Sequence, residues 1–308
     1  MYAMNQKNKG NLMKNNKTNR LFLGVVCLVL SAFFYSLMSL FVRLSGDLPT
    51  FQKSFFRNII AAVAGFILLI KSGSLKMKKG NLPFLLGRSI AGTVGVLCNF
   101  YAIDHMNISD ASILNKLAPF FSILFSIFLL REKAGWKDLL LVGVAFGGAL
   151  FVVKPSFDVS KSLPAVIGVI GGLSAGLAYT FVRKLGKNGE QSAMIVFFFS
   201  TFSCLAMLPL TLLQYQPMSW AQVGFLLLAG VAATGAQFTV TAAYTFAAAK
   251  EISVYDYSQV LFAALWGMIF LHEYPDYLSI IGYTIIITAA IIKYLSSRKK
   301  KVKNTLDL

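Results

Sequence analysis

The chain has 308 residues, and only 13% of them are charged, whereas charged residues make up roughly a quarter of an ordinary globular domain. This excludes a soluble enzyme, and the 56% of hydrophobic residues indicate a protein whose solvent is the lipid bilayer. The net charge of +17 comes from 29 Lys and Arg against 12 Asp and Glu. Such an excess can indicate nucleic-acid binding, but the basic residues lie mostly in short connections, so no nucleic-acid partner is expected.

Ten apolar stretches remain when the chain is cut at charged and turn-forming residues. They are residues 21–42, 54–70, 83–103, 108–130, 135–153, 164–182, 192–213, 220–247, 253–271 and 277–295. Helices of these lengths cross a hydrocarbon core of roughly 30 Å. No stretch alternates apolar and polar residues with period two, which argues against a β-barrel. The sequence therefore predicts an all-α polytopic membrane protein with ten transmembrane helices.

The first stretch follows a basic arm, residues 1–20, which is rich in Asn and Lys and is expected to be disordered. The apolar region after this arm exceeds the roughly 7–15 residues of a secretory signal peptide. We therefore expect a first membrane span there, and no cleaved leader.

The distribution of basic residues predicts the orientation. With the N-terminus inside, 22 of the 29 Lys and Arg lie on the inner side and 4 on the outer side. The positive-inside rule then places the arm, residues 1–20, and the basic tail, residues 297–308, in the cytoplasm of a plasma-membrane protein. Anionic lipid headgroups are the expected partner of the tail. The remaining three of the 29, Arg57, Arg88 and Lys116, lie inside apolar stretches and are assigned to neither side.

An internal repeat organises the ten helices. The run LSAFFYSLMSLFVRL (30–44) shares both of its ends with LSAGLAYTFVRKL (173–185), and FLLRE (128–132) corresponds to IFLHE (269–273). We refer to the spacing from position 128 to position 269 as the repeat offset. Five helices have been duplicated. Because five is odd, the second copy enters the membrane from the opposite side, which gives two inverted repeats, 21–153 and 164–296.

A known family shares these features. The run FYAIDHMNISDASILNKLAPFFSILFSIFLLREK (100–133), with Pro119 inside a helix, and the run VLFAALWGMIFLHE (260–273) resemble the EamA domain. Their order and spacing resemble the ten-helix EamA branch of the drug/metabolite transporter superfamily, over about residues 20–296. The resemblance implies inverted five-helix repeats, secondary transport of small metabolites and a central cavity lined by helices three, four, eight and nine. One departure is that Val260 takes the place of Pro119 in the second half.

Polar residues inside a bilayer are expensive and should face the bundle interior. Helical spacing groups them into stripes on helices three, four, eight and nine. The candidate substrate-binding residues are Lys116, Arg88, Asn99, Asn115, Gln237, Thr241, Tyr244, Tyr257, Gln259 and Trp266. Structural alternatives stay open: Gly92 and Gly95 can serve helix packing, Ser and Thr side chains can bond their own helix backbone, and Arg57 and Arg88 can snorkel to the interface.

The repeat offset places Lys116 opposite Tyr257 and Asn115 opposite Asp256, so the two halves differ chemically where they should line one cavity. Lys116 and Asp256 could face a zwitterionic substrate, pair until substrate or a proton separates them, or form a permanent ion pair. Asp256 is the candidate for proton coupling, because burial disfavours the charged form of a carboxyl group. Asp110 is expected to cap its helix and Glu273 to pair locally or lie at the interface.

The sequence therefore predicts a secondary-active transporter that moves a small polar metabolite, an amino acid or an organic anion, by alternating access. Proton-coupled export is one form, and sodium coupling is another. The alternatives are a lipid-carrier flippase and an assembly subunit that transports nothing. Nucleophile and base motifs, an H-E-x-x-H motif and a Walker motif do not occur in the sequence, so we expect no enzyme activity, no cofactor and no metal. We expect the transporter to be a monomer or a homodimer.

Overall fold

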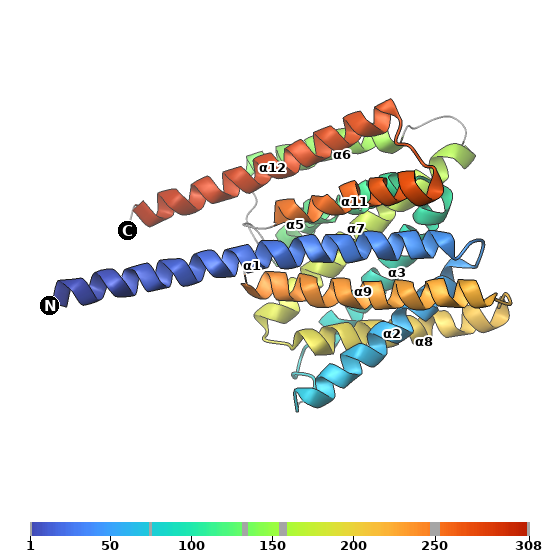
Figure 1. The fold of residues 1–308 in the computed structure, drawn as a ribbon, viewed down its shortest axis with the longest axis horizontal. Coiled ribbons are helices and arrows are strands. Elements are labelled where there is room, and N and C mark those ends of the chain that lie inside the picture. The colour runs from blue at the N-terminus through green and yellow to red at the C-terminus, as the bar shows by residue number, and fades with distance from the viewer. Residues whose placement is uncertain (1, 74–75, 131–134, 154–158, 247–252, 307–308) are drawn as a thin grey trace.

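A computed structural model describes residues 2–73, 76–130, 135–153, 159–246 and 253–306, and side chains for most of them. All regular structure in these ranges is helical, and the helices form one elongated bundle (Figure 1). Both termini lie at the same end of this bundle, as an even number of crossings requires. We refer to it as the terminal end, and to the opposite end as the far end.

The described helices make ten crossings at the ten predicted stretches. In chain order these are α1 (Tyr2–Leu44), α2 (Thr50–Lys71), α3 (Leu82–His105), α4 (Ile108–Asn115) with α5 (Ala118–Leu129), α6 (Trp136–Val153), α7 (Val159–Lys187), α8 (Ser192–Leu213), α9 (Trp220–Phe246), the group η1 (Ser253–Tyr257), α11 (Ser258–Trp266) and η2 (Gly267–Leu271), and α12 (Tyr277–Leu306). The fold class predicted from the sequence is confirmed.

Length and composition support membrane insertion. Seven of the described segments are long and apolar enough to cross a bilayer, and two shorter apolar helices, Leu139–Val152 and Tyr277–Ile292, lie in α6 and α12. The remaining crossing is divided into η1, α11 and η2, so it has no single long helix. Large apolar side chains remain exposed along the helices, among them Phe22, Leu140 and Leu261. Such a surface suits lipid and not water.

The basic arm differs from expectation. Residues expected to be disordered continue α1 as a helix of 43 residues from Tyr2, which at 1.5 Å per residue is about 65 Å long, twice the hydrocarbon core. The arm therefore projects beyond the bundle, as Figure 1 shows. Once a membrane span has formed a helix, each further residue adds one hydrogen bond without a new nucleation step, so a polar segment can continue it.

Two of the crossings are interrupted at related positions. The fourth breaks at Lys116, where α4 ends, and restarts at Ala118 with Pro119 in the first turn of α5. The ninth begins with the 3-10 helix η1, which ends at Tyr257, the position that the repeat offset relates to Lys116. A proline lacks the N–H that would continue the helix. The span predicted over 108–130 is present as Ile108–Leu129, but it is divided into the two helices α4 and α5 at Lys116 and Leu117.

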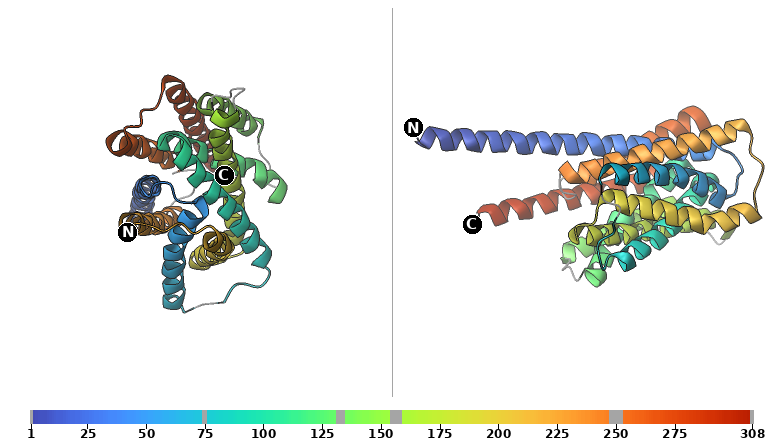
Figure 2. Two further views of the ribbon diagram at one scale, coloured as in Figure 1. Left: turned by 90° about the vertical axis from the view of Figure 1, so that its right-hand side faces the viewer. Right: turned by 90° about the horizontal axis from the view of Figure 1, so that it is seen from below.

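The main helix contacts cross between the two halves of the chain. Helix α1 packs on α9, α3 packs on α7, α2 packs on α8, and α6 packs on α12. The first two contacts are equivalent under the repeat, because each joins the first helix of one half to the third helix of the other. The end-on view in Figure 2 shows helices of the two halves side by side around the bundle. The repeats are thus intertwined and do not form two separate domains.

Side-chain amides at related positions tie connections at opposite ends of the bundle. Asn81, at the start of α3, donates from Nδ2 to the carboxylate of Glu190 over 2.8 Å. Gln222, at the equivalent position near the start of α9, donates from Nε2 to the carbonyl oxygen of Ser45 over 3.0 Å. The same donor type therefore performs the same task at both ends, as an inverted repeat predicts.

Candidate functional site

An ion pair joins the two halves beside the helix breaks. Lys116 Nζ lies 2.6 Å from Asp256 Oδ2, and the two side chains are 8% and 21% exposed. Lys116 follows the last residue of α4, and Asp256 lies in η1. The breaks bring the two charges together, because neither Lys116 nor Asp256 lies in a regular α-helix: Lys116 follows the end of α4, and Asp256 lies in a 3-10 helix. Of the alternatives left open by the sequence, the structure shows the paired arrangement.

Tyr257 makes the second contact at this place. Its hydroxyl donates to the carbonyl oxygen of Lys116 over 3.1 Å, so two residues at equivalent positions in the halves touch each other. When residues related by a two-fold axis are in contact, the axis must pass between them. For inverted repeats this axis lies in the membrane plane. The Lys116–Asp256 pair therefore lies next to the pseudo-symmetry axis, where the halves meet.

Arg88 lies away from this pair, in the interior between α3 and α8. Its side chain is 7% exposed, and its guanidinium carbon lies 3.8 Å from the centre of the Phe199 ring. A Cβ at Gly92, one turn further along α3, would overlap Nη1 of Arg88 and lie 2.9 Å from the Phe199 ring. Gly92 is therefore the residue that gives the guanidinium its space. Gly95 instead packs closely on α7, with Ala175 and Gly171 as neighbours.

Arg57 is buried in the same interior and does not snorkel. It is 3% exposed on α2, and its Nη1 donates to the side-chain oxygen of Asn58 over 2.6 Å. Asn58 in turn donates to the hydroxyl of Ser203 on α8 over 2.9 Å. The Nε atoms of Arg57 and Arg88 are buried and have no hydrogen-bond partner among the described residues. Neither arginine forms an ion pair with a described carboxylate.

Two tyrosines lie within electrostatic range of the arginines, and one of the two is also within range of Asp256. Arg57 and Arg88 interact electrostatically with each other and with Tyr35 of α1 and Tyr179 of α7. Tyr35 also interacts with Asp256. Because α1 and α7 are the first helices of the two halves, the tyrosines flank the arginines from equivalent elements. We refer to Tyr35, Arg57, Arg88 and Tyr179 as the arginine cluster.

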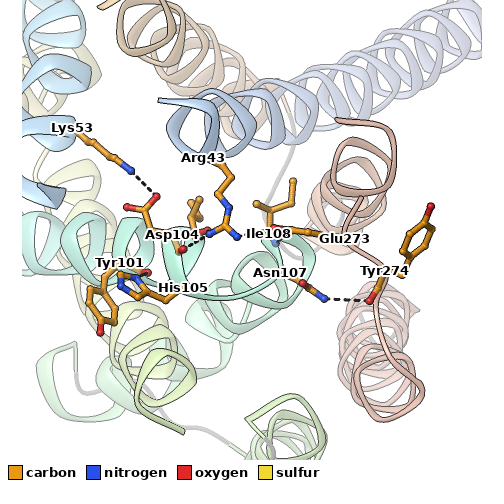
Figure 3. Close-up of polar contacts among 10 residues, drawn as sticks. Arg43, Lys53, Tyr101, Asp104, His105, Asn107, Ile108, Glu273 and Tyr274 are labelled. Atoms are coloured by element: carbon orange, nitrogen blue, oxygen red, sulfur yellow. Dashed lines mark hydrogen bonds and ion pairs between the residues drawn. The ribbon is translucent and has the colours of Figure 1, made fainter. Parts of the chain in front are cut away.

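A separate set of charges closes the far end of the bundle (Figure 3). Lys53 of α2 is fully buried, and its Nζ lies 2.6 Å from Asp104 Oδ1 on α3. Arg43, at the end of α1, lies 3.0 Å from Glu273 Oε1, which belongs to the other half. Arg43 also donates to the carbonyl oxygens of Ile103, over 2.8 Å, and Asp104. We refer to Arg43, Lys53, Asp104 and Glu273 as the far-end cluster, in which every cation has a carboxylate partner.

Two acidic residues make tertiary contacts that the sequence does not predict. Glu273 does not pair locally: it bridges the halves through Arg43, and its Oε2 accepts the backbone N–H of Ile108 over 2.9 Å. Asp110 lies in the first turn of α4, but the N-cap position belongs to Asn107. The Asp110 carboxylate accepts from the hydroxyl of Tyr283 on α12 over 2.6 Å. Tertiary contacts, which local sequence does not encode, decide both cases.

The other predicted site residues are not all brought together. Asn115 lies beside Lys116 and is partly exposed, while Asn99 and Gln237 are partly exposed on α3 and α9. On α11, Gln259 is buried, and the indole of Trp266 donates to the hydroxyl of Ser36 on α1 over 3.0 Å. The predicted side chains of Thr241 and Tyr244 lie outside the described residues.

Sequence reasoning missed Asn58 and Phe199, which hold the two arginines. Asn58 carries a readable signal, since it is a polar side chain next to Arg57 inside an apolar helix. Phe199 carries none, because it is one of three consecutive phenylalanines at 197–199 and only the rotation of α8 selects the one that faces Arg88.

Comparisons with known proteins bear on this arrangement. Residues 22–154 and 163–295 each match the model of the EamA-like transporter family, and the repeat offset relates the two matched segments. The chain is 35% identical to the pseudopaline exporter CntI of Pseudomonas aeruginosa, over 90% of this chain and 97% of that protein. It is 25% identical to human solute carrier family 35 member G1, over 90% and 81% of the two chains. A crystal structure at 15% identity superposes with a TM-score of 0.64, over 89% of this chain and 98% of the other, and so shares its fold.

Proposed function

Since the chain belongs to the EamA-like transporter family and is a multi-pass membrane transporter of metabolites, we propose that it is a secondary-active exporter of a small polar metabolite. It acts in the plasma membrane with both termini in the cytoplasm, and its two halves rock around a central site. The direction is supported by the 35% identity to a protein named as an exporter.

The observation that carries the proposal is the Lys116–Asp256 ion pair, with its Nζ to Oδ2 distance of 2.6 Å. The pair joins the two halves beside the pseudo-symmetry axis. When the halves move relative to each other, the distance between Lys116, after α4, and Asp256, in η1, changes. Breaking one partner of a buried pair leaves an isolated charge, which is strongly unfavourable. A substrate anion that takes the place of the Asp256 carboxylate beside Lys116, while Asp256 accepts a proton, leaves no isolated charge and lets the halves separate.

Asp256 couples transport to protons in this proposal. Its carboxylate oxygen lies 2.6 Å from Lys116 Nζ, so the protonation state of Asp256 decides whether Lys116 has a counter-charge. When Asp256 is neutral, Lys116 is free to attract an anionic group of the substrate. Return of the carboxylate to its charged form restores the pair and releases the substrate on the other side.

Transport into inside-out membrane vesicles tests this function. A mixture of labelled amino acids and organic acids is offered with and without a pH gradient, and uptake is followed by mass spectrometry. For the metabolite that enters, Lys116→Ala and Asp256→Asn should each lower the initial rate about tenfold or more, because each leaves one buried charge alone.

Matched controls are Lys79→Ala and Asp47→Asn, which make the same chemical changes at exposed positions in connections and should transport normally. If both site variants also transport at the rate of the unmodified protein, the proposed site is wrong. A rate that does not respond to the pH gradient removes proton coupling and leaves sodium coupling or exchange.

A further inference from the structure

The interior between α2, α3 and α8 contains buried polar atoms that the protein does not satisfy. Nine buried side-chain N or O atoms among the described residues have no hydrogen-bond partner, and seven of them are on these three helices. The seven are Ser54 Oγ, Arg57 Nε, Arg88 Nε, Ser89 Oγ, Thr93 Oγ1, Ser200 Oγ and Thr201 Oγ1. Buried polar groups in folded proteins nearly always have partners, so such a concentration marks a place where something other than the protein binds.

The charges of Arg57 and Arg88 indicate the chemical class of the missing partner. Arg57 and Arg88 are 3% and 7% exposed, they interact electrostatically with each other, and neither is paired with a described carboxylate. Two guanidiniums in a low-dielectric interior repel each other and lack a counter-charge. The hydroxyl groups nearby can donate hydrogen bonds but carry no charge. The missing complement is therefore an anion.

The geometry points to a carboxylate-binding site at the arginine cluster: Arg57 and Arg88 hold an anionic carboxylate group of the transported metabolite, with Tyr35 and Tyr179 flanking it. This inference rests on the proposed transport function and deepens it by naming the substrate class as organic acids. Guanidinium groups suit this task because their planar N–H donors match the two oxygens of a carboxylate.

The arginine cluster draws both of its positive charges from one half of the chain, whereas the Lys116–Asp256 pair joins the two halves. Arg57 and Arg88 belong to the first half, and the equivalent positions of the second half hold Phe198 and Ala229. The second half therefore supplies no matching charge at this place. Tyr35 is within electrostatic range of both arginines and of Asp256.

Gly92 provides a test that leaves both charges in place. An alanine there would put its Cβ onto Nη1 of Arg88. Because the guanidinium is the far end of a flexible side chain, it moves and the helix does not. A matched control is Gly143→Ala on α6, where an added Cβ meets nothing within 4 Å. Both substitutions add one methyl group inside a membrane helix, but only one displaces Arg88.

Ligand-dependent thermal stability of the purified protein in detergent is the first measurement. The probes are acetate, succinate, glutarate, glutamate and inorganic phosphate, with a neutral polyol at the same concentration for reference. Succinate, glutarate or glutamate should raise the melting temperature in a saturable manner. Arg57→Met, Arg88→Met and Gly92→Ala should each weaken the apparent affinity about tenfold or more, and Gly143→Ala should retain the original affinity. Arg88→Lys keeps the positive charge but lacks the planar pair of N–H donors, so its apparent affinity should lie between those of the unmodified protein and Arg88→Met.

The outcomes separate this inference from the proposed function. Vesicle transport of a neutral or cationic metabolite at an unchanged rate in Arg57→Met and Arg88→Met would refute the anion site and leave the transporter intact. Absence of any carboxylate-dependent shift would also refute it. Carboxylate binding that the arginine variants abolish, with no transport of any metabolite, would support the site and overturn the proposed export. A shift produced only by an added anionic phospholipid would assign the guanidiniums to a lipid headgroup and contradict the inference.

Discussion

Apart from the Lys116–Asp256 pair, two regions of the bundle hold basic side chains, and the two regions treat their charges in opposite ways. In the far-end cluster, Lys53 and Arg43 each have a carboxylate within 3.0 Å. In the arginine cluster, Arg57 and Arg88 are buried as Lys53 is, but they have no carboxylate partner among the described residues. Burial of a cation by itself therefore does not identify its role.

This difference distinguishes the charged residues that stabilise the fold from those that are available to bind a ligand. A cation paired at 2.6 Å inside the bundle holds two helices together, and removing its partner leaves an isolated buried charge. A cation without a partner contributes little to the fold and can even oppose it. The two regions should consequently respond to substitution with different magnitudes and different signs.

The largest effect is expected from Asp104→Asn, which removes the only carboxylate that Lys53 contacts among the described residues. Lys53 is 1% exposed, so the free energy of unfolding should fall by about 3–5 kcal/mol. Titration of the purified protein with denaturing detergent measures it. The double variant Lys53→Met with Asp104→Leu should recover most of this loss, because it buries no charge. Failure to recover it would show that the pair is not the cause.

A smaller effect is expected from Glu273→Gln at the same end. Arg43 loses its carboxylate but keeps the carbonyl oxygens of Ile103 and Asp104, and its side chain is 28% exposed. Partly exposed pairs contribute about 1 kcal/mol or less. The same titration should show that decrease. A loss as large as that of Asp104→Asn would mean that the bridge between the halves is a main element of stability.

The smallest effect on stability is expected from Arg57→Met in the arginine cluster. Without metabolite, the free energy of unfolding should stay within about 1 kcal/mol of the original value or increase, because the substitution removes an unpaired buried charge. The comparison would fail if Arg57→Met destabilised the protein as strongly as Asp104→Asn does, since that would make Arg57, through its hydrogen bond to Asn58, a structural residue. Combined with a loss of transport, an unchanged stability would separate function from folding at this residue.

Much of the fold can be predicted from the sequence because membrane insertion depends on local composition. The predicted stretch 192–213 coincides with α8, and the repeat offset recurs in the matched family segments. The arm at residues 1–20 has the composition of a disordered segment but continues α1. The composition of the arm does not predict a helix, but the first membrane span, which follows it, is helical and extends into the arm.

The candidate site is only partly readable. Lys116 and Asp256 stand out because charges inside apolar stretches are rare and because the repeat places them at neighbouring positions. Their contact depends on breaks at Lys116 and at Tyr257, of which only the first carries a local signal, in Pro119. Lys53 and Arg43 count as outer-side residues in the charge distribution, and nothing near them in the sequence indicates their partners 51 and 230 residues away.

The sequence by itself determined the number of crossings, the inverted repeat and the short list of buried charges, because each depends on hydrophobicity, on parity or on self-similarity along the chain. The tertiary structure alone decided which basic residues are neutralised, on that list and outside it. That depends on how each helix is rotated and tilted against its neighbours: Asp104 faces Lys53, and Phe199 and Gly92 face Arg88. Rotation is set by packing over the whole bundle, so the distinction between a structural cation and one held for a ligand appears only in three dimensions.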